Sequence, residues 1–168
     1  MSFAACVKIL LQSEGGFVDD PEDPGGATNL GVDIHTLSGE LGRPATVADV
    51  KALTVAQASD IYLRTYYNPA HCGDLPDGVD LMVFDAAINS GQGRAIRLLQ
   101  SAVGVDDDGA FGPATLAAVR AMAPKAIIDK FHDLHAAFYA GLPTYWKFGG
   151  GWDARNDRTR SLAIGMIK

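Results

Sequence analysis

The chain has 168 residues, a length that suits one domain or at most two. Apolar residues make up 48% and charged residues 20%, which excludes a disordered chain because enough apolar side chains are present to form a core. The net charge of −6 argues against nucleic acid as a partner, since proteins that bind it present basic surfaces to phosphates. No apolar run approaches the ~20 residues that cross a bilayer, so we expect no stable membrane insertion.

The N-terminal segment predicts an amphipathic helix over about Phe3–Ser13, in which Phe3, Val7, Leu10 and Leu11 share one face. Lys8 interrupts its apolar stretch and no basic segment precedes it, so we do not interpret it as a signal peptide. Cys6 is expected in the core, and two cysteines are too few for a disulfide framework.

From Phe17 to Gly42 the chain is rich in Gly, Pro, Asp and Asn and shows no long period. We expect an ordered loop there, with Phe17–Val18 and Leu30–Ile34 as candidates for short strands of a small hairpin.

Helical periodicity dominates the rest of the chain. Helices are predicted to begin near Thr46 and Thr54, and to cover Val79–Asn89, Gly93–Val103, Pro113–Met122 and, as the longest helix, Pro124 to Gly141. Gly149–Trp152 is predicted to be a loop before a last helical stretch. These patterns predict an all-α bundle with one long functional loop near its N-terminus.

Glu14 stands at the end of the first predicted helix, directly before Gly15 and Gly16. The partial negative charge of a helix C-terminus favours the protonated form of a carboxyl group, and partial burial has the same effect. A carboxylic acid that stays protonated near neutral pH can protonate a glycosidic oxygen. Glu14 is therefore a candidate general acid.

The segment after Glu14 supports this interpretation. It places four acidic residues within positions 19–23, beside two prolines and two glycines that restrict the backbone. Long loops in compact domains are usually functional or disordered, and the prolines and glycines favour an ordered one. The spacing lacks the alternating ligands of a calcium loop.

These motifs resemble the glycoside hydrolase family 108 N-acetylmuramidases, a family of phage endolysins and bacterial secretion-associated muramidases with a lysozyme-like fold. The resemblance rests in the first half on Glu14–Phe17, Asp20–Gly26 and Thr28–Gly31. In the second half it rests on Asp74–Gly78, Val83–Asp85, Asn89–Gly91, Asp108–Gly109, Gly112–Leu116 and Gly150–Trp152 with Arg155, which resemble the peptidoglycan-binding region of that family. It implies a muramidase region over residues 1–85 and a peptidoglycan-binding helical region over 86–168, packed as one compact unit.

The resemblance makes Glu14 the catalytic acid of a hydrolase that cleaves the β-1,4 link between N-acetylmuramic acid and N-acetylglucosamine. Asp23 and Thr28 follow at nearly the spacing of phage lysozymes and are assigned to positioning water or stabilising the transition state, with Asp20 as a rival to Asp23 that also contacts substrate. The chain departs from the family pattern at Asp33, where Thr is usual, and at Tyr66–Tyr67, where Tyr-Trp is expected.

Further contacts to the polymer are expected from Tyr67, Asn89 and Gln92. Tyr67 offers a face on which a sugar can stack, whereas Tyr62 and Tyr66 have the spacing of core residues. Asn89 and Gln92 can hydrogen-bond acetamido groups. Phe84 and Asp85 follow an apolar stretch, so Phe84 is expected in the core and Asp85 in a buried hydrogen bond or facing the groove. Trp152 is expected either to cap the bundle or to contact wall material.

Two other functions stay open. A metal-dependent wall amidase or peptidase would take its ligands from His35, His71, His132 and His135, yet no His-Glu-x-x-His motif is present and His132 and His135 are expected on the surface. A non-catalytic wall-binding module would bind peptidoglycan without releasing reducing ends.

We expect no cofactor and no metal, bacterial peptidoglycan as partner, and a monomer. The protein is expected to be made in the cytoplasm without a signal peptide and to act in the periplasm or cell wall, after release through a holin or another route independent of Sec.

Overall fold

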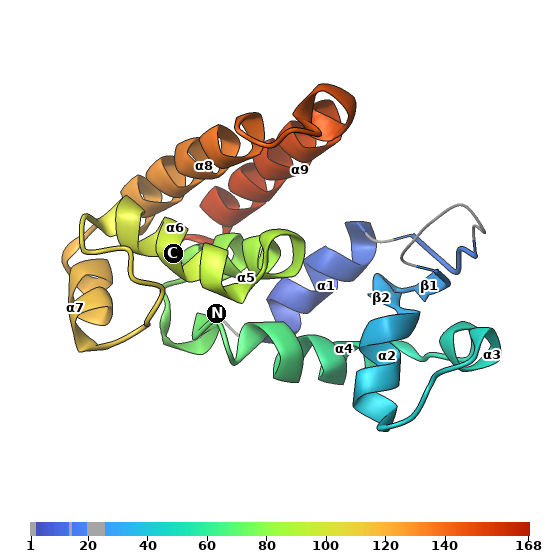
Figure 1. Cartoon of the computed structure of the whole chain (residues 1–168). Coiled ribbons are helices and arrows are strands. Elements are labelled where there is room, and N and C mark those ends of the chain that lie inside the picture. The colour runs from blue at the N-terminus through green and yellow to red at the C-terminus, as the bar shows by residue number, and fades with distance from the viewer. Residues whose placement is uncertain (1–2, 14, 20–25) are drawn as a thin grey trace. The chain divides into compact units, whose positions relative to one another are not determined.

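The computed structural model describes residues 3–13, 15–19 and 26–168, and these residues form helices and one two-stranded antiparallel sheet (Figure 1). The prediction of a mostly helical fold with a small hairpin is confirmed. The chain divides into an N-terminal unit, residues 4–65, and a C-terminal unit, which comprises residues 66–168 and Phe3.

The N-terminal unit contains one hairpin among short helices. Its elements are, in chain order, α1 (Phe3–Ser13, apart from Phe3 itself), β1 (Thr28–Asn29), β2 (Val32–Asp33), α2 (Ile34–Leu41), α3 (Val47–Lys51) and α4 (Val55–Tyr62). The bounds of α1 agree with the sequence prediction, and Cys6 is fully buried as expected. Thr46 and Thr54 each form a capping box, which explains why α3 and α4 begin where the sequence predicts.

Helix α2 was not predicted. Its sequence, Ile34–Leu41, holds a serine and a glycine and buries only Leu37. Its two ends are nevertheless well specified, because the Asp33 side chain caps the first turn and Gly42 ends the helix in the left-handed conformation, at φ +63°. The caps rather than the apolar period define this helix.

The C-terminal unit is built around a buried central helix. After a π-helical turn, η1 (Leu63–Tyr67), which contains the boundary between the units, come η2 (Cys72–Asp74), α5 (Val79–Ser90), α6 (Gln92–Val103), α7 (Pro113–Ala121), α8 (Pro124–Ala140) and α9 (Tyr145–Met166). Nine consecutive residues of α5, Val79–Ala87, are buried, and α5 packs against α6, α8 and α9. Helices α8 and α9 lie side by side as an antiparallel pair (Figure 1).

The predicted loop at Gly149–Trp152 is wrong, because these residues lie inside α9, which is longer than α8. Three glycines in a row indicated a loop, since glycine is unfavourable in a helix interior. At Gly149 the structure shows why glycine is required there. A Cβ at this position would lie 2.5 Å from ring carbons of Tyr145, one turn earlier.

Among the described residues, no helix combines the length and the apolar character that a membrane span requires.

Candidate functional site

The end of α1 leads directly to the predicted acid. The helix ends at Ser13, and its last turn carries no basic residue that would offset the negative end of the helix dipole. Glu14 itself lies outside the described residues. Its place in the sequence, immediately after the last residue of α1, is the place that the acid hypothesis requires.

The segment that follows is closed by a pair of backbone hydrogen bonds. The amide of Val18 donates to the carbonyl of Thr28, and the amide of Thr28 donates to the carbonyl of Val18, both at 2.8 Å. Asp20 and Asp23 fall between these two residues in the sequence and lie outside the described residues. Of the three predicted catalytic residues, Thr28 alone is described, at the start of β1 with its hydroxyl donating to the Gly26 carbonyl at 3.3 Å.

The hairpin that holds Thr28 turns through a strained backbone. Thr28 pairs with Asp33 and Asn29 pairs with Val32, while the two residues of the turn, Leu30 and Gly31, both have positive φ. Two positive φ values are typical of a type I′ turn, which normally disfavours a leucine. The hydroxyl of Tyr62, a residue that is buried as predicted, donates to the Leu30 carbonyl at 3.1 Å and helps hold this turn.

Asn29 fixes the hairpin to α3, a role that the sequence analysis did not assign. Its side chain is buried and its Nδ2 donates to the Val50 carbonyl at 3.0 Å. The signal for this role is the asparagine within the Thr28–Gly31 motif, because a buried amide needs a partner.

Asp33 departs from the family pattern, and its structure explains how the chain accommodates the change. The Asp33 carboxylate accepts hydrogen bonds from the amides of His35 and Thr36, each at 2.8 Å. Thr and Asp are both good N-caps, so either residue can start α2 at this position.

Tyr67 is placed differently from the expectation of an exposed stacking face. Its side chain is only 4% exposed, and its ring makes edge contacts with Phe3 and Phe84 at centroid distances of 5.1 and 5.3 Å. Phe84 is fully buried, as predicted. Tyr66, expected in the core, is half-buried instead. Tyr67 packs inward because three aromatic rings fill one region of the core.

Asn89 and Gln92 lie where α5 ends and α6 begins, separated by Ser90 and by Gly91, which has φ +84°. Both side chains are exposed, and the Asn89 amide donates to the Asp85 carbonyl at 2.7 Å. The structure thus brings these two residues to one corner of the C-terminal unit, with surface free for polar contacts.

Asp85 forms the buried interaction that the sequence analysis considered. Its Oδ1 accepts from Arg155 Nε at 2.9 Å, which joins α5 to α9. Burial raises the pKa of the Asp85 carboxyl, and the charge of Arg155 opposes this shift. The pair is a structural link between helices far apart in the sequence.

His135 corrects the expectation of a surface residue. It is 1% exposed and its Nε2 lies 3.0 Å from the Ser90 hydroxyl. Burial lowers the pKa of His135 to about 4, so the ring is neutral at neutral pH. Among the described residues, no group of three or more His, Cys, Asp or Glu side chains is arranged to hold a metal ion.

Comparisons with known proteins agree with the family resemblance. A family model described as glycosyl hydrolase 108 matches residues 7–91, and one described as a predicted peptidoglycan domain matches residues 94–157. The solved structure of Brucella abortus SagA is 48% identical in sequence, with a TM-score of 0.90 over 99% of this chain and 95% of that chain. A search of curated proteins found no match.

Proposed function

Because the chain belongs to the glycosyl hydrolase 108 family, we propose that it is an N-acetylmuramidase with Glu14 as its general acid. The family and the peptidoglycan domain make it a peptidoglycan hydrolase. The bond proposed to be cleaved is the β-1,4 link between N-acetylmuramic acid and N-acetylglucosamine.

The observation that supports this proposal most strongly is the position at which α1 ends. A carboxyl group that follows a helix C-terminus without a basic residue in the last turn is favoured in its protonated form. Glu14 would donate its proton to the glycosidic oxygen as the bond to the sugar ring breaks. The departing sugar thus leaves as an alcohol rather than as an alkoxide.

The second catalytic function is assigned to the segment that the Val18–Thr28 hydrogen bonds close. Asp23 would stabilise the positively charged transition state or activate water, with Asp20 as the alternative. Thr28 supports them from β1, where both its backbone amide and its carbonyl are already paired. Its hydroxyl, which donates to the Gly26 carbonyl, can still accept a hydrogen bond from a water or a sugar hydroxyl.

The decisive experiment compares purified wild-type protein and the Glu14→Gln variant on peptidoglycan. Glu14→Gln keeps the size of the side chain and removes its acidic proton, so we expect the rate of release of reducing ends to fall at least 100-fold while binding to peptidoglycan persists. Glu40→Gln is the matched control in the same unit. It makes the same chemical change at a half-buried carboxylate that pairs with Arg64 outside the proposed catalytic residues, and should leave the rate within twofold.

The products decide between the proposal and its alternatives. Reducing N-acetylmuramic acid ends support the muramidase, whereas anhydro ends identify a transglycosylase. New amino termini that disappear with a chelator identify a metal-dependent amidase or peptidase. Binding without any new ends identifies a wall-binding module, and full activity of Glu14→Gln rules out its role as the acid.

A further inference from the structure

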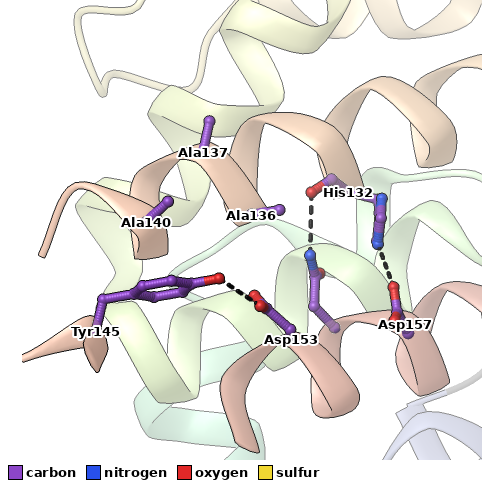
Figure 2. Close-up of a pocket in the computed structure, with 8 residues that line it drawn as sticks. His132, Ala136, Ala137, Ala140, Tyr145, Asp153 and Asp157 are labelled. Carbon is purple, nitrogen blue, oxygen red and sulfur yellow. Dashed lines mark hydrogen bonds and ion pairs between the residues drawn. The ribbon is translucent and has the colours of Figure 1, made fainter. Parts of the chain in front are cut away.

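The C-terminal unit contains a pocket between α8 and α9 that the proposed catalytic machinery does not use. Its volume is about 430 Å³. Figure 2 shows three alanines of α8 along one wall and polar side chains along the other. The lining residues are His132, Ala136, Ala137, Ala140, Tyr145, Asp153, Asn156 and Asp157.

The glycine in α9 shapes one wall of this pocket. Tyr145, Gly149 and Asp153 follow one another at steps of four residues, so they lie on one face of α9. Because Gly149 has no side chain, the Tyr145 ring lies against the helix, and its hydroxyl donates to Asp153 Oδ2 at 2.6 Å. This hydrogen bond raises the pKa of the Tyr145 hydroxyl, which therefore stays a donor.

The hydrogen-bond donors of the polar wall are already used within the protein. Tyr145 donates to Asp153, and Asn156 Nδ2 donates to the His132 carbonyl at 3.0 Å. The two ring nitrogens of His132 face carboxylates, with Asp157 Oδ1 at 2.8 Å and Asp133 Oδ1 at 3.0 Å. A ligand therefore finds few donors in this pocket.

The acceptors differ, because one is unpaired within the protein and another is exposed. Asp153 Oδ1 is buried and has no hydrogen-bond partner, and the Asp157 side chain is 73% exposed. No Lys or Arg is among the described residues that line the pocket. A buried carboxylate oxygen without a donor is unfavourable, and a donor from a ligand would relieve this cost.

These features specify the chemistry of a ligand. It should bring N–H donors and positive charge to Asp153 and Asp157, and an apolar stem to Ala136, Ala137 and Ala140. We propose that the pocket binds the side-chain ammonium group of the diamino acid in the stem peptide of peptidoglycan, with its methylene groups against the alanines. The proposal rests on the proposed function only in taking peptidoglycan as the partner.

Free stem peptides test the proposal without any glycosidic bond. The probes are alanyl-γ-glutamyl tetrapeptides that carry either lysine or meso-diaminopimelate at the third position, each acetylated at its N-terminus to imitate the linkage to the glycan. Each is compared, by calorimetric titration into the full chain, with a version whose side-chain amine is also acetylated. Acetylation removes the charge and should weaken binding at least tenfold. The two probes show which diamino acid fits better.

Two variants locate the binding site. Asp153→Asn removes one charge while keeping an acceptor for the Tyr145 hydroxyl, and Ala140→Leu fills the pocket from the exposed side of α8 without changing any charge. Each should weaken binding of the amine-bearing peptides at least tenfold. Asp107→Asn removes an exposed charge elsewhere in the same unit and should change binding less than twofold.

Equal binding of the amine-bearing and acetylated peptides, no binding of either, or unchanged binding by Asp153→Asn and Ala140→Leu would overturn the proposal. Changes in the NMR chemical shifts of α8 and α9 residues on addition of a peptide-free disaccharide would assign the pocket to the glycan instead. Cleavage of peptide-free glycan strands should be unaffected by Ala140→Leu, so failure of this proposal and failure of the Glu14 hypothesis give different results.

Discussion

Two histidines of α8, three residues apart, have opposite surroundings. The His132 side chain is 18% exposed and lies beside carboxylates, whereas His135 is buried against the Ser90 hydroxyl and the Tyr139 ring. The buried residues of α8 are Ile127, Ile128, Phe131, His135 and Tyr139, and all but Ile128 follow one another at steps of four residues. Leu134 and Phe138, which are more apolar than histidine, are only half-buried. A histidine joins the core here because a hydroxyl is in reach of its ring.

The buried His135 should make stability depend on pH. In the unfolded chain a histidine takes up a proton below about pH 6.5, whereas the native state does so only near pH 4. The free energy of unfolding should therefore fall by about 3 kcal/mol as the pH drops from 6.5 to 4. In the His135→Gln variant this decrease in the free energy of unfolding should be absent. Urea unfolding at several pH values measures it.

The contribution of His135 is the difference in pH dependence between the wild type and the His135→Gln variant. Burial raises the pKa of Asp85, so the native state binds the proton of this carboxyl more tightly than the unfolded chain does. This effect changes the free energy of unfolding with pH in the opposite direction. It is the same in the wild type and in the variant. His35→Gln, at an exposed position, should retain the wild-type slope. Identical slopes for wild type and His135→Gln would contradict the prediction.

At the scale of single elements, the three consecutive glycines of α9 differ in their effect on stability. Two of them only lower helix propensity, whereas the third makes room for an aromatic ring. Gly150 and Gly151 have open space around them, so Gly150→Ala and Gly151→Ala should each raise stability by about 0.5–1 kcal/mol through the better helix propensity of alanine. Gly149→Ala should lower stability, because its methyl group would collide with the Tyr145 ring. Thermal unfolding of the three variants measures the two expected increases in stability and the expected decrease. Stabilisation by Gly149→Ala would contradict this account.

Helix α2 depends on its first cap. Asp33→Ala should lower the free energy of unfolding by about 0.5–2 kcal/mol, because the amides of His35 and Thr36 lose their acceptor. Asp33→Thr restores a capping hydroxyl and should come within about 0.5 kcal/mol of the wild type. Denaturant unfolding compares them. Equal losses for both variants would show that the carboxylate acts in another way.

The elements that the sequence predicted well share a physical origin. Capping boxes at Thr46 and Thr54, and the prolines that open α7 and α8, act locally and can be recognised without a fold. Helix α2 and the middle of α9 could not be predicted in this way. The first buries a single side chain, and the second contains three glycines, of which Gly149 alone is covered by the Tyr145 ring.

The candidate site was predictable to a different degree. The position of Glu14 after a helix end follows from local sequence, and the structure places the end of α1 there. The link from Asn29 to α3 and the burial of Tyr67 depend on residues distant in the sequence, so periodicity could not reveal them.

At the scale of the whole molecule, the family matches and the compact units divide the chain at different places. The glycosyl hydrolase match ends at residue 91, yet α5 belongs to the C-terminal unit, where it packs against α6, α8 and α9. The boundary expected near residue 86 also falls inside α5. The buried pair Asp85–Arg155 strengthens this connection.

Fragments should reflect this arrangement. A chain of residues 94–157 lacks α5 and the last part of α9, so it should fail to fold cooperatively in circular dichroism and thermal melts. A chain of residues 66–168 keeps all five helices α5–α9 and should melt cooperatively. It lacks Phe3, which contacts Tyr67 and Phe84, so its melting temperature should lie below that of the full chain. Cooperative folding of 94–157 would contradict the central role of α5.

The two hydrogen bonds between Val18 and Thr28 also bear on how this family can diverge. Doubling the length of a loop whose ends are already tied adds only about 0.6 kcal/mol of closure entropy. Insertions or deletions between these residues can therefore accumulate with little harm to folding. The hairpin itself is held by pairing between Thr28 and Asp33 and between Asn29 and Val32, which does not depend on the length of that segment.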